Sequence, residues 1–281
     1  MVVYVKPLGW NPRAWIADVI IESWQRDALS FYCFFETKAM PISFLDANPL
    51  PRRRRLYLVR HGDVSYFDDK GRPFRPNTVP LNDEGKQQAQ AAGRELMNVP
   101  LDRIVSSDLV RCIETASIIS AGRNLPVDLR EALREIQPGR LADIPPDRAA
   151  QIFLGAFTNP VDSEARFLEG ETFGSLAARV LPCLRSLLED STWRHLLIVA
   201  HGGVNRLILT HALGTGMGGF GALEQDPACI NILDVADSGQ FLVRLVNYTP
   251  YNPLKIELEM TTMERLFFQY RSGVLKDRET E

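Results

Sequence analysis

The chain has 281 residues, with 32 Lys and Arg against 35 Asp and Glu, a formal net charge of −3. Since 45% of its residues are hydrophobic, burial can offset the loss of chain entropy, which excludes wholesale disorder. No sustained basic stripe interrupts the mixed charge, and this argues against a dedicated nucleic-acid binder. The length fits one large α/β domain or two small ones.

Neither a membrane span nor a secretory signal is expected. The most apolar N-terminal stretch, residues 15–35, is interrupted by four charged residues, so it is too polar to cross a bilayer. It also lacks the order of basic, apolar and small-residue regions of a signal peptide. The cysteines form no Cys-x-x-Cys pair and are interpreted as reduced core thiols: Cys33, Cys112, Cys183 and Cys229. We therefore expect a cytoplasmic protein with no membrane partner; the oligomeric state stays open.

Residues 1–50 differ from the rest of the chain. Apolar residues recur there at helical spacing and predict an amphipathic helix that packs on the main domain: Trp15, Ile16, Val19, Ile20 and Trp24. Met40 opens a stretch that runs directly into the following region and would serve as an alternative start. We therefore expect an N-terminal extension over 1–50, a candidate for a dispensable segment, and a main domain over 51–281.

From residue 52 the chain alternates strand-like and helix-like segments. The four arginines at 52–55 are expected to be a solvated flank of the first strand. Short segments rich in Leu, Ile and Val predict strands over Leu56–Arg60, Arg103–Ser106, Val127–Glu135 and Leu196–Ala200. Amphipathic spacing predicts helices over Asp83–Met97, Asp108–Ser120 and Phe173–Leu188, capped by Asn82, Ser107 and Thr172. The alternation predicts an α/β fold of three layers, helix, sheet and helix, with a mostly parallel sheet.

Three later regions depart from this alternation. Residues 140–170 carry three prolines and a cluster of phenylalanines, which indicates a helical or irregular cap insertion. Cys229–Val235 and Gln240–Asn247 flank a turn signal and predict a C-terminal antiparallel hairpin. The glycines at 214–221 follow a helix rather than a strand, so we interpret them as a flexible connection and not as a nucleotide-binding loop.

Two of the four histidines share one local pattern. His61 and His201 each follow an apolar strand and are each followed by glycine, in Arg60-His61-Gly62 and in Ala200-His201-Gly202. Ligands bind at this edge of a parallel sheet, and glycine lets backbone N–H groups approach an anion. The two histidines are therefore expected to face one pocket. The other two histidines fall elsewhere, and no Cys or acidic cluster completes a metal-ligand set, so no metal is expected.

A third element runs from Ser106 to Ala116, where a strand leads into a helix with Arg111 in its first turn. The helix dipole favours anions at this end, so an arginine is not placed there for the dipole. It would suit an anion that the helix N-terminus attracts. Taken alone, Arg111 would be interpreted as a solvated surface arginine.

Together these motifs resemble the histidine phosphatase superfamily, the phosphoglycerate-mutase-like enzymes. The Arg-His-Gly signature stands at 60–62, the Ser-x-Leu-x-Arg-x-x-x-Thr-Ala element at 107–116 and the second His-Gly at 201–202. The stretch 80–89 resembles the family's Leu-Thr-x-x-Gly-x-x-Gln-Ala helix start, and 170–172 its Gly-Glu-Ser/Thr opening. The resemblance covers roughly residues 55–248 and implies a phosphoglycerate-mutase-like fold for the main domain.

The resemblance also implies roles for single residues. His61 would be the nucleophile that takes the phosphoryl group, and a proton donor is implied at Glu135, in Leu-Arg-Glu-Ile-x-x-Gly, with Glu131 as the rival carboxylate. Neither a metal nor a cofactor is required. The phosphate oxygens and substrate would be held by Arg60, Arg111 and a protonated His201, together with Gly62, Ser65 and Gly202.

Two positions depart from the family pattern. A small hydroxyl residue and an asparagine usually stand third and sixth after the histidine, but here these are Val64 and Phe67. Each lost phosphate contact costs about 1 kcal/mol or more, unless Ser65 replaces one of them.

The spacing of the motifs bears on the reaction. Only 90 residues separate Arg111 from His201 (201 − 111 = 90), whereas true mutases carry a long insertion there. We therefore expect hydrolysis of a small phosphorylated substrate through a phosphohistidine. Two alternatives stay open: a phosphoglycerate-type mutase, and a weakly catalytic protein that binds a phosphorylated ligand.

Overall fold

A six-stranded sheet runs through the protein in the computed structural model, which describes residues 52–279 apart from 69–71, 73, 159–160 and 257–258. The strand order is β3-β2-β4-β1-β5-β6. The strands are β1 (Arg53–Arg60), β2 (Arg103–Ser107), β3 (Val127–Arg130), β4 (His195–Ala200), β5 (Ile230–Ala236) and β6 (Phe241–Tyr248). The first four are parallel, and β5 and β6 join antiparallel, so the predicted mostly parallel sheet with a C-terminal hairpin is confirmed. The predicted N-terminal extension lies outside the described residues.

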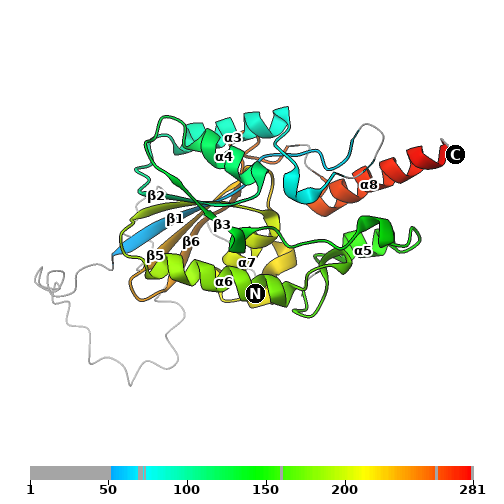
Figure 1. The fold of residues 1–281 in the computed structure, drawn as a ribbon. Coiled ribbons are helices and arrows are strands. Elements are labelled where there is room, and N and C mark those ends of the chain that lie inside the picture. The colour runs from blue at the N-terminus through cyan, green and yellow to red at the C-terminus, as the bar shows by residue number, and fades with distance from the viewer. Residues whose placement is uncertain (1–51, 69–71, 73, 159–160, 257–258, 280–281) are drawn as a thin grey trace, which may run out of the picture. The chain divides into compact units, whose positions relative to one another are not determined.

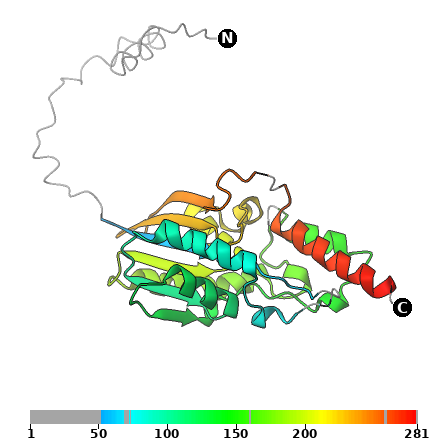
Figure 2. The ribbon, with the colours of Figure 1, turned by 90° about the horizontal axis from the view of Figure 1, so that it is seen from above.

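Helices cover both faces of the sheet, as the predicted three layers require. Figure 1 shows α3 (Asp83–Leu96) and α4 (Val110–Ile119) on one face, and α6 (Phe173–Glu189) and α7 (Gly202–Leu213) on the other. Figure 2 shows α8 (Thr262–Glu279) lying beside α5 (Ala149–Gly155), outside the sheet. None of the helices described here is long and apolar enough to cross a membrane.

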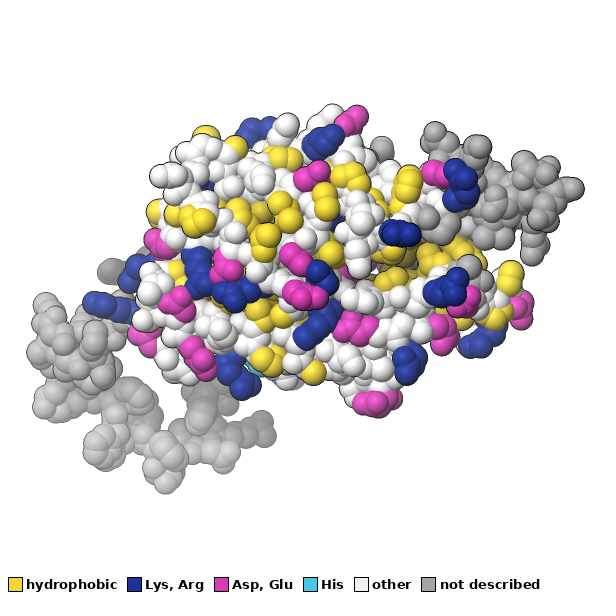
Figure 3. All heavy atoms as spheres, in the orientation of Figure 1, with side chains coloured by type: hydrophobic (Ala, Val, Ile, Leu, Met, Phe, Trp, Pro, Cys, Tyr) yellow, Lys and Arg dark blue, Asp and Glu magenta, His cyan; other side chains and the backbone are white. Residues whose placement is uncertain are grey.

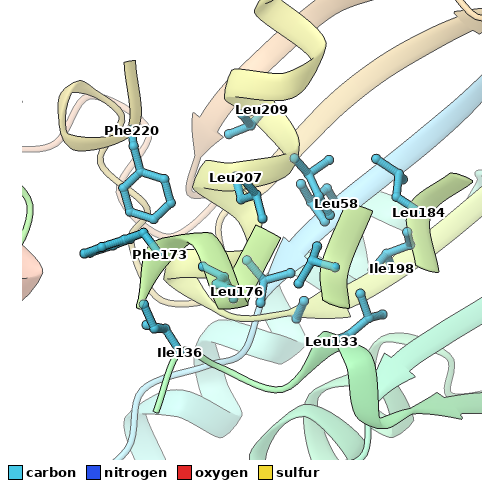
Figure 4. Packing of buried hydrophobic residues seen from close by; sticks show 14 of the residues in the cluster. Leu58, Leu133, Ile136, Phe173, Leu176, Leu184, Ile198, Leu207, Leu209 and Phe220 are labelled. Carbon is cyan, nitrogen blue, oxygen red and sulfur yellow. The ribbon is translucent and has the colours of Figure 1, made fainter. Parts of the chain in front are cut away.

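The core divides into two main clusters because side chains alternate between the faces of β1. Leu58 and Ile198, from neighbouring strands, pack against Leu176, Leu184 and Leu207 of α6 and α7 (Figure 4). Tyr57 and Val59, on the opposite face, pack against residues of α3 and α4. Each large side chain buried this way contributes about 1.5–3 kcal/mol. On the surface seen in Figure 3, acidic and basic side chains are interspersed rather than gathered into one basic patch.

Two predicted boundaries are wrong, and both lie beside the site. β3 ends at Arg130 instead of Glu135, and a 3-10 helix over Glu131–Leu133 follows. α4 begins at Val110 without a side-chain cap, although Ser107 was the expected cap. Ser107 is still paired within β2, and its hydroxyl lies 2.8 Å from His201 Nε2. The predicted caps Asn82 and Thr172 are confirmed, since each accepts a backbone N–H of its helix.

The arginine run is also more structural than expected. Strand β1 begins at Arg53, so most of the run belongs to the sheet. Arg54 lies 4.3 Å above the ring of Trp193 and donates to two backbone carbonyls, and Arg55 pairs with Asp234 at 2.7 Å. The expected solvated flank is therefore wrong, because these side chains find partners on neighbouring elements.

The remaining connections agree with expectation in outline. The cap region holds α5 and two short 3-10 helices, Leu141–Asp143 and Phe167–Glu169, joined by irregular chain. The glycine-rich segment, expected to be a flexible connection, contains the 3-10 helix Gly216–Ala222. The described cysteines are free thiols, and the two that are fully buried, Cys112 and Cys229, have a pKa raised to about 12 by that burial.

Candidate active site

His61 and His201 meet at one edge of the sheet. They follow Arg60 and Ala200, which are paired in the parallel register of β1 and β4, so the two backbones reach the edge together. The ring centroids lie 5.2 Å apart, and the residues are 2% and 0% exposed. The sequence prediction that both histidines face one pocket is therefore supported by their geometry.

His61 is held in one tautomer. Its Nδ1 lies 2.7 Å from the carbonyl oxygen of Gly62, which can only accept, so Nδ1 carries the hydrogen. Burial, followed by the charges of Arg111 and Arg60, lowers the pKa of His61 well below its ordinary value. The imidazole is therefore neutral at pH 7, with the lone pair on Nε2.

His201 is neutral as well. Its pKa is lowered well below the ordinary value by burial, by Arg111 and by His61. Ser107 Oγ lies 2.8 Å from Nε2, and Cys112 Sγ lies 3.4 Å from the same atom. In the ligand-free protein, burial and two nearby guanidiniums disfavour the protonated imidazole, and the protonated His201 expected beside a bound phosphoryl group stays a prediction.

Two buried guanidiniums accompany the histidines. Arg60 is 7% exposed and Arg111 2% exposed. Arg60 Nη1 donates to the carbonyl of Gln225 at 2.6 Å, and Arg111 Nη1 donates to that of Pro76 at 2.6 Å. Among the described residues, neither Nε has a hydrogen-bond partner. Buried donors of this kind call for an acceptor, and charged donors bind phosphate oxygens strongly. Arg111 is therefore not a solvated surface arginine.

Backbone contacts fix the turn after His61. A Cβ atom on Gly62 would lie 2.3 Å from the carbonyl oxygen of Gly85, so only glycine allows this approach. The amide of Gly62 donates to Thr115 Oγ1 at 3.1 Å, and the amide of Asp63 donates to Gln88 Oε1 at 2.9 Å. The turn is thus held by residues of α3 and α4, which explains why the motifs on those helices accompany Arg-His-Gly.

The carboxylate of Glu135 lies against the first turn of α7. Both of its carboxylate oxygens accept from the amide of Gly203 at 3.1 Å, and Oε1 also accepts from Ile136 at 2.9 Å. Glu131 is different: its side chain is 76% exposed and pairs with Arg134 at 2.6 Å. The geometry thus favours Glu135 over Glu131 as the carboxylate of the site.

Arg179, which the sequence did not point to, holds the loop that carries Glu135. Its guanidinium donates to the carbonyls of Ala132, Arg134 and Glu135 at 2.6–3.1 Å. It also pairs with Glu171 at 2.8 Å, which gives the Gly-Glu-Thr element a structural purpose. No local pattern marks Arg179, because the carbonyls that it binds lie more than 40 residues away.

The structure separates the other predicted positions. A Cβ on Gly202 would lie 3.6 Å from Arg60 Nε and 3.8 Å from Glu135 Oε2, so this glycine borders the site. Ser65 is exposed, and its hydroxyl lies 3.5 Å from Asn82 Nδ2. Val64 is buried in an apolar cluster with three residues, Val79, Leu81 and Ala89. The position that usually offers a hydroxyl is thus used for packing. Among the described residues, no group of three or more His, Cys, Asp or Glu could hold a metal ion.

Curated relatives match large parts of this chain. The chain is 27% identical over 219 residues to a probable 2-carboxy-D-arabinitol-1-phosphatase of Arabidopsis thaliana, covering 75% of this chain and 45% of the relative. It therefore spans less than half of that protein. It is 30% identical over 162 residues to a probable phosphoglycerate mutase, GpmB, of Salmonella paratyphi A, covering 57% of this chain and 75% of the relative.

Solved structures share the fold. YhfR of Bacillus stearothermophilus matches with a TM-score of 0.59 and 29% identity, over 68% of this chain and 95% of its own. A mycobacterial glucosyl-3-phosphoglycerate phosphatase in complex with VO3 matches with a TM-score of 0.57 and 27% identity, over 69% of this chain and 98% of its own. The family model for branch 1 of the histidine phosphatase superfamily matches residues 56–248. The chain therefore belongs to the histidine phosphatase superfamily, branch 1.

Proposed function

We propose that this protein hydrolyses small phosphate monoesters through a phosphohistidine on His61. The observation that carries the proposal is the neutral His61, with a free lone pair on Nε2, beside two buried guanidiniums whose Nε groups lack partners among the described residues. A neutral imidazole is a competent nucleophile, and phosphoryl transfer otherwise requires mainly alignment and positive charge.

In the first step, His61 Nε2 attacks phosphorus in line with the ester oxygen. The N–P bond forms as the P–O bond breaks, and the leaving oxygen takes a proton from the carboxyl group of Glu135. Arg60, Arg111 and His201 donate hydrogen bonds to the phosphoryl oxygens and offset their charge. The proton stays on His61 Nδ1, which keeps donating to the Gly62 carbonyl, and this hydrogen bond stabilises the imidazolium that forms.

In the second step, water replaces the alcohol. The Glu135 carboxylate takes a proton from water as the water oxygen attacks phosphorus, and the N–P bond breaks. The electron pair returns to Nε2, so His61 is neutral again and inorganic phosphate is released with Glu135 protonated. Atoms and charges therefore balance over the cycle, and the protein returns to its starting state.

Hydrolysis is favoured over a mutase reaction by the short segment between Arg111 and His201. The mycobacterial structure is named as a glucosyl-3-phosphoglycerate phosphatase, which also supports hydrolysis over isomerisation. Its name supports a small phosphorylated substrate as well. The GpmB relatives make isomerisation the competing outcome. Val64 packs in an apolar cluster at the position where the family usually has a hydroxyl residue. One phosphate contact is therefore lost, and binding without turnover is the other competing outcome.

The test compares the wild type with His61→Ala and with His211→Ala, a control at an exposed histidine. The substrates are p-nitrophenyl phosphate and a panel of sugar phosphates, nucleotides, phosphoglycerates and lipid-like phosphates. We expect the wild type and the control to release inorganic phosphate and His61→Ala to release none. Brief incubation with substrate should also label His61 with an acid-labile phosphate.

Three results would contradict the proposal. These are full activity of His61→Ala, label on a serine or aspartate, and conversion of a phosphoglycerate to its isomer without phosphate release.

A further inference from the structure

We propose that Thr262, at the start of α8, is a positioning residue that orients the Arg60 guanidinium for phosphate. The inference rests on the proposed function and deepens it. The family match ends at Tyr248, so α8 lies beyond the matched residues. Figure 2 shows that α8 begins next to the body of the protein and extends away beside α5.

The hydrogen bonds give Thr262 a defined orientation. Its Oγ1 donates to Glu224 Oε1 at 2.8 Å and lies 3.3 Å from Arg60 Nη1. A hydroxyl has one hydrogen and two lone pairs, so a donor to Glu224 can present only a lone pair to the guanidinium. The hydroxyl therefore fixes one edge of Arg60, together with the Gln225 carbonyl at 2.6 Å.

The chemical identity of this contact matters for phosphate binding. Glu224 Oε1 also accepts from Arg206 Nη2 at 2.7 Å, so the carboxylate is paired with a different buried arginine. A direct carboxylate contact to Arg60 would neutralise the charge that a phosphate needs. A neutral hydroxyl between Glu224 and Arg60 instead orients the guanidinium and leaves its charge, and its Nε, for the ligand.

The position of Thr262 is held by contacts that are independent of the site. The next residue, Met263, is 6% exposed and belongs to the main core cluster. Phe267 packs on Phe153 of α5, with ring centroids 5.7 Å apart. Arg265 lies 3.6 Å from the buried carboxylate of Asp226. α8 therefore starts from a fixed point, which a positioning role requires.

The test uses point variants of the full chain. Thr262→Val keeps the shape but removes the hydroxyl, and Thr262→Ser keeps the hydroxyl. The matched control is Thr261→Val, because the Thr261 hydroxyl accepts from the amide of Glu264 at 3.2 Å and caps α8 without a described contact to Arg60. The readouts are the binding of inorganic phosphate by calorimetry, kcat and KM for p-nitrophenyl phosphate, and the melting temperature.

We expect Thr262→Val to weaken phosphate binding and lower kcat/KM by about tenfold, a loss typical of one hydrogen bond to a charged group. Thr262→Ser should stay close to the wild type, and Thr261→Val should melt lower while binding phosphate normally. The inference is overturned if Thr262→Val binds phosphate like the wild type, if serine fails to restore binding, or if Thr261→Val loses as much affinity.

The binding readout separates this inference from the proposed function. If the wild type binds phosphate without turning over any ester, the proposed hydrolysis fails, and the order of affinities among the variants still decides the role of Thr262. If the wild type does not bind phosphate at all, both ideas are wrong.

Discussion

Glu135 and Gly203 are joined through both carboxylate oxygens of the glutamate, each 3.1 Å from the glycine amide. Gly203 is the second residue of α7, and His201 is the cap residue of the same helix. An anion is favoured at a helix N-terminus, where N–H groups lack partners within the helix. One helix therefore fixes the candidate proton donor relative to the histidine that borders the phosphate position.

The first prediction concerns Glu135→Gln. An alkyl phosphate needs a proton on its leaving group, whereas p-nitrophenolate leaves without one. We expect the variant to lose rate on an alkyl phosphate by about 10²–10⁴-fold, the usual worth of general acid catalysis, and to lose much less on the aryl ester in the first step. Single-turnover rates of leaving-group release on both esters measure the difference.

Glu131→Gln serves as its control, because Glu131 is exposed and its partner Arg134 lies outside the site. That variant should match the wild type on both esters. Equal losses of Glu135→Gln on the two esters would remove Glu135 from the acid role, and a selective loss in Glu131→Gln would assign the role to that residue.

The second prediction concerns Arg179, which we expect to act through Glu135. Arg179→Leu removes the donors to three loop carbonyls and breaks the ion pair with Glu171. We expect kcat on an alkyl phosphate to fall by about tenfold or more, since displacing a catalytic group by about 1 Å can cost 10²-fold. The aryl ester should be less affected, which a merely destabilised protein would not show.

The matched control is Arg185→Leu, an exposed position on the same helix α6. It should leave both rates unchanged. If Arg179→Leu lowered both rates equally in proportion to a lost folded fraction, the residue would be structural only, and a melting curve measured beside the kinetics would show this.

The sequence predicted the sheet and its edge well because local patterns determine them. Apolar strands followed by His-Gly placed His61 and His201 correctly at adjacent strand ends, since parallel strands in register end together. The helix motifs were informative as well. Gly85 and Thr115, which belong to these motifs, contact the turn at Gly62.

What the sequence did not predict depends on long-range contacts. Ser107 has the residue type of a helix N-cap. Its hydroxyl instead lies within hydrogen-bond distance of His201 Nε2, 94 residues away in the sequence. Arg179 and Thr262 have no motif, since their partners come from distant loops. The lowered pKa of His201 in the ligand-free protein depends first on its own burial and then on the charge of Arg111, and neither can be seen in a local pattern.

The third prediction concerns the N-terminal segment. Among the described residues, the contacts that hold His61, Glu135 and His201 come from residues after 60, so we expect residues 1–39 not to be needed to assemble them. We therefore expect a chain that starts at Met40 to fold and to keep the activity of the full chain, with at most a lower melting temperature. An insoluble product, or a folded but inactive one, would make the segment part of the core or of the substrate site.

The last prediction concerns stability at acidic pH. His61 and His201 have lowered pKa values in the folded protein, whereas each titrates near about 6.5 in an unfolded chain. Below that pH the unfolded chain binds more protons than the folded one, so the free energy of unfolding decreases as the pH falls. The slope reaches at most about 1.4 kcal/mol per pH unit for each histidine, and it vanishes above that range.

Urea unfolding at pH 7.5 and 5.5 measures this effect. We expect the decrease in unfolding free energy between the two pH values to be about 2 kcal/mol smaller in a double variant, His61→Asn with His201→Asn, than in the wild type. Carboxylates titrate in both proteins and cancel in the comparison. His211→Asn, at an exposed position, should keep the wild-type pH dependence. An unchanged pH dependence in the double variant would mean that both histidines titrate in the folded protein as they do in the unfolded chain, which would remove the lowered pKa values from the argument for a neutral nucleophile.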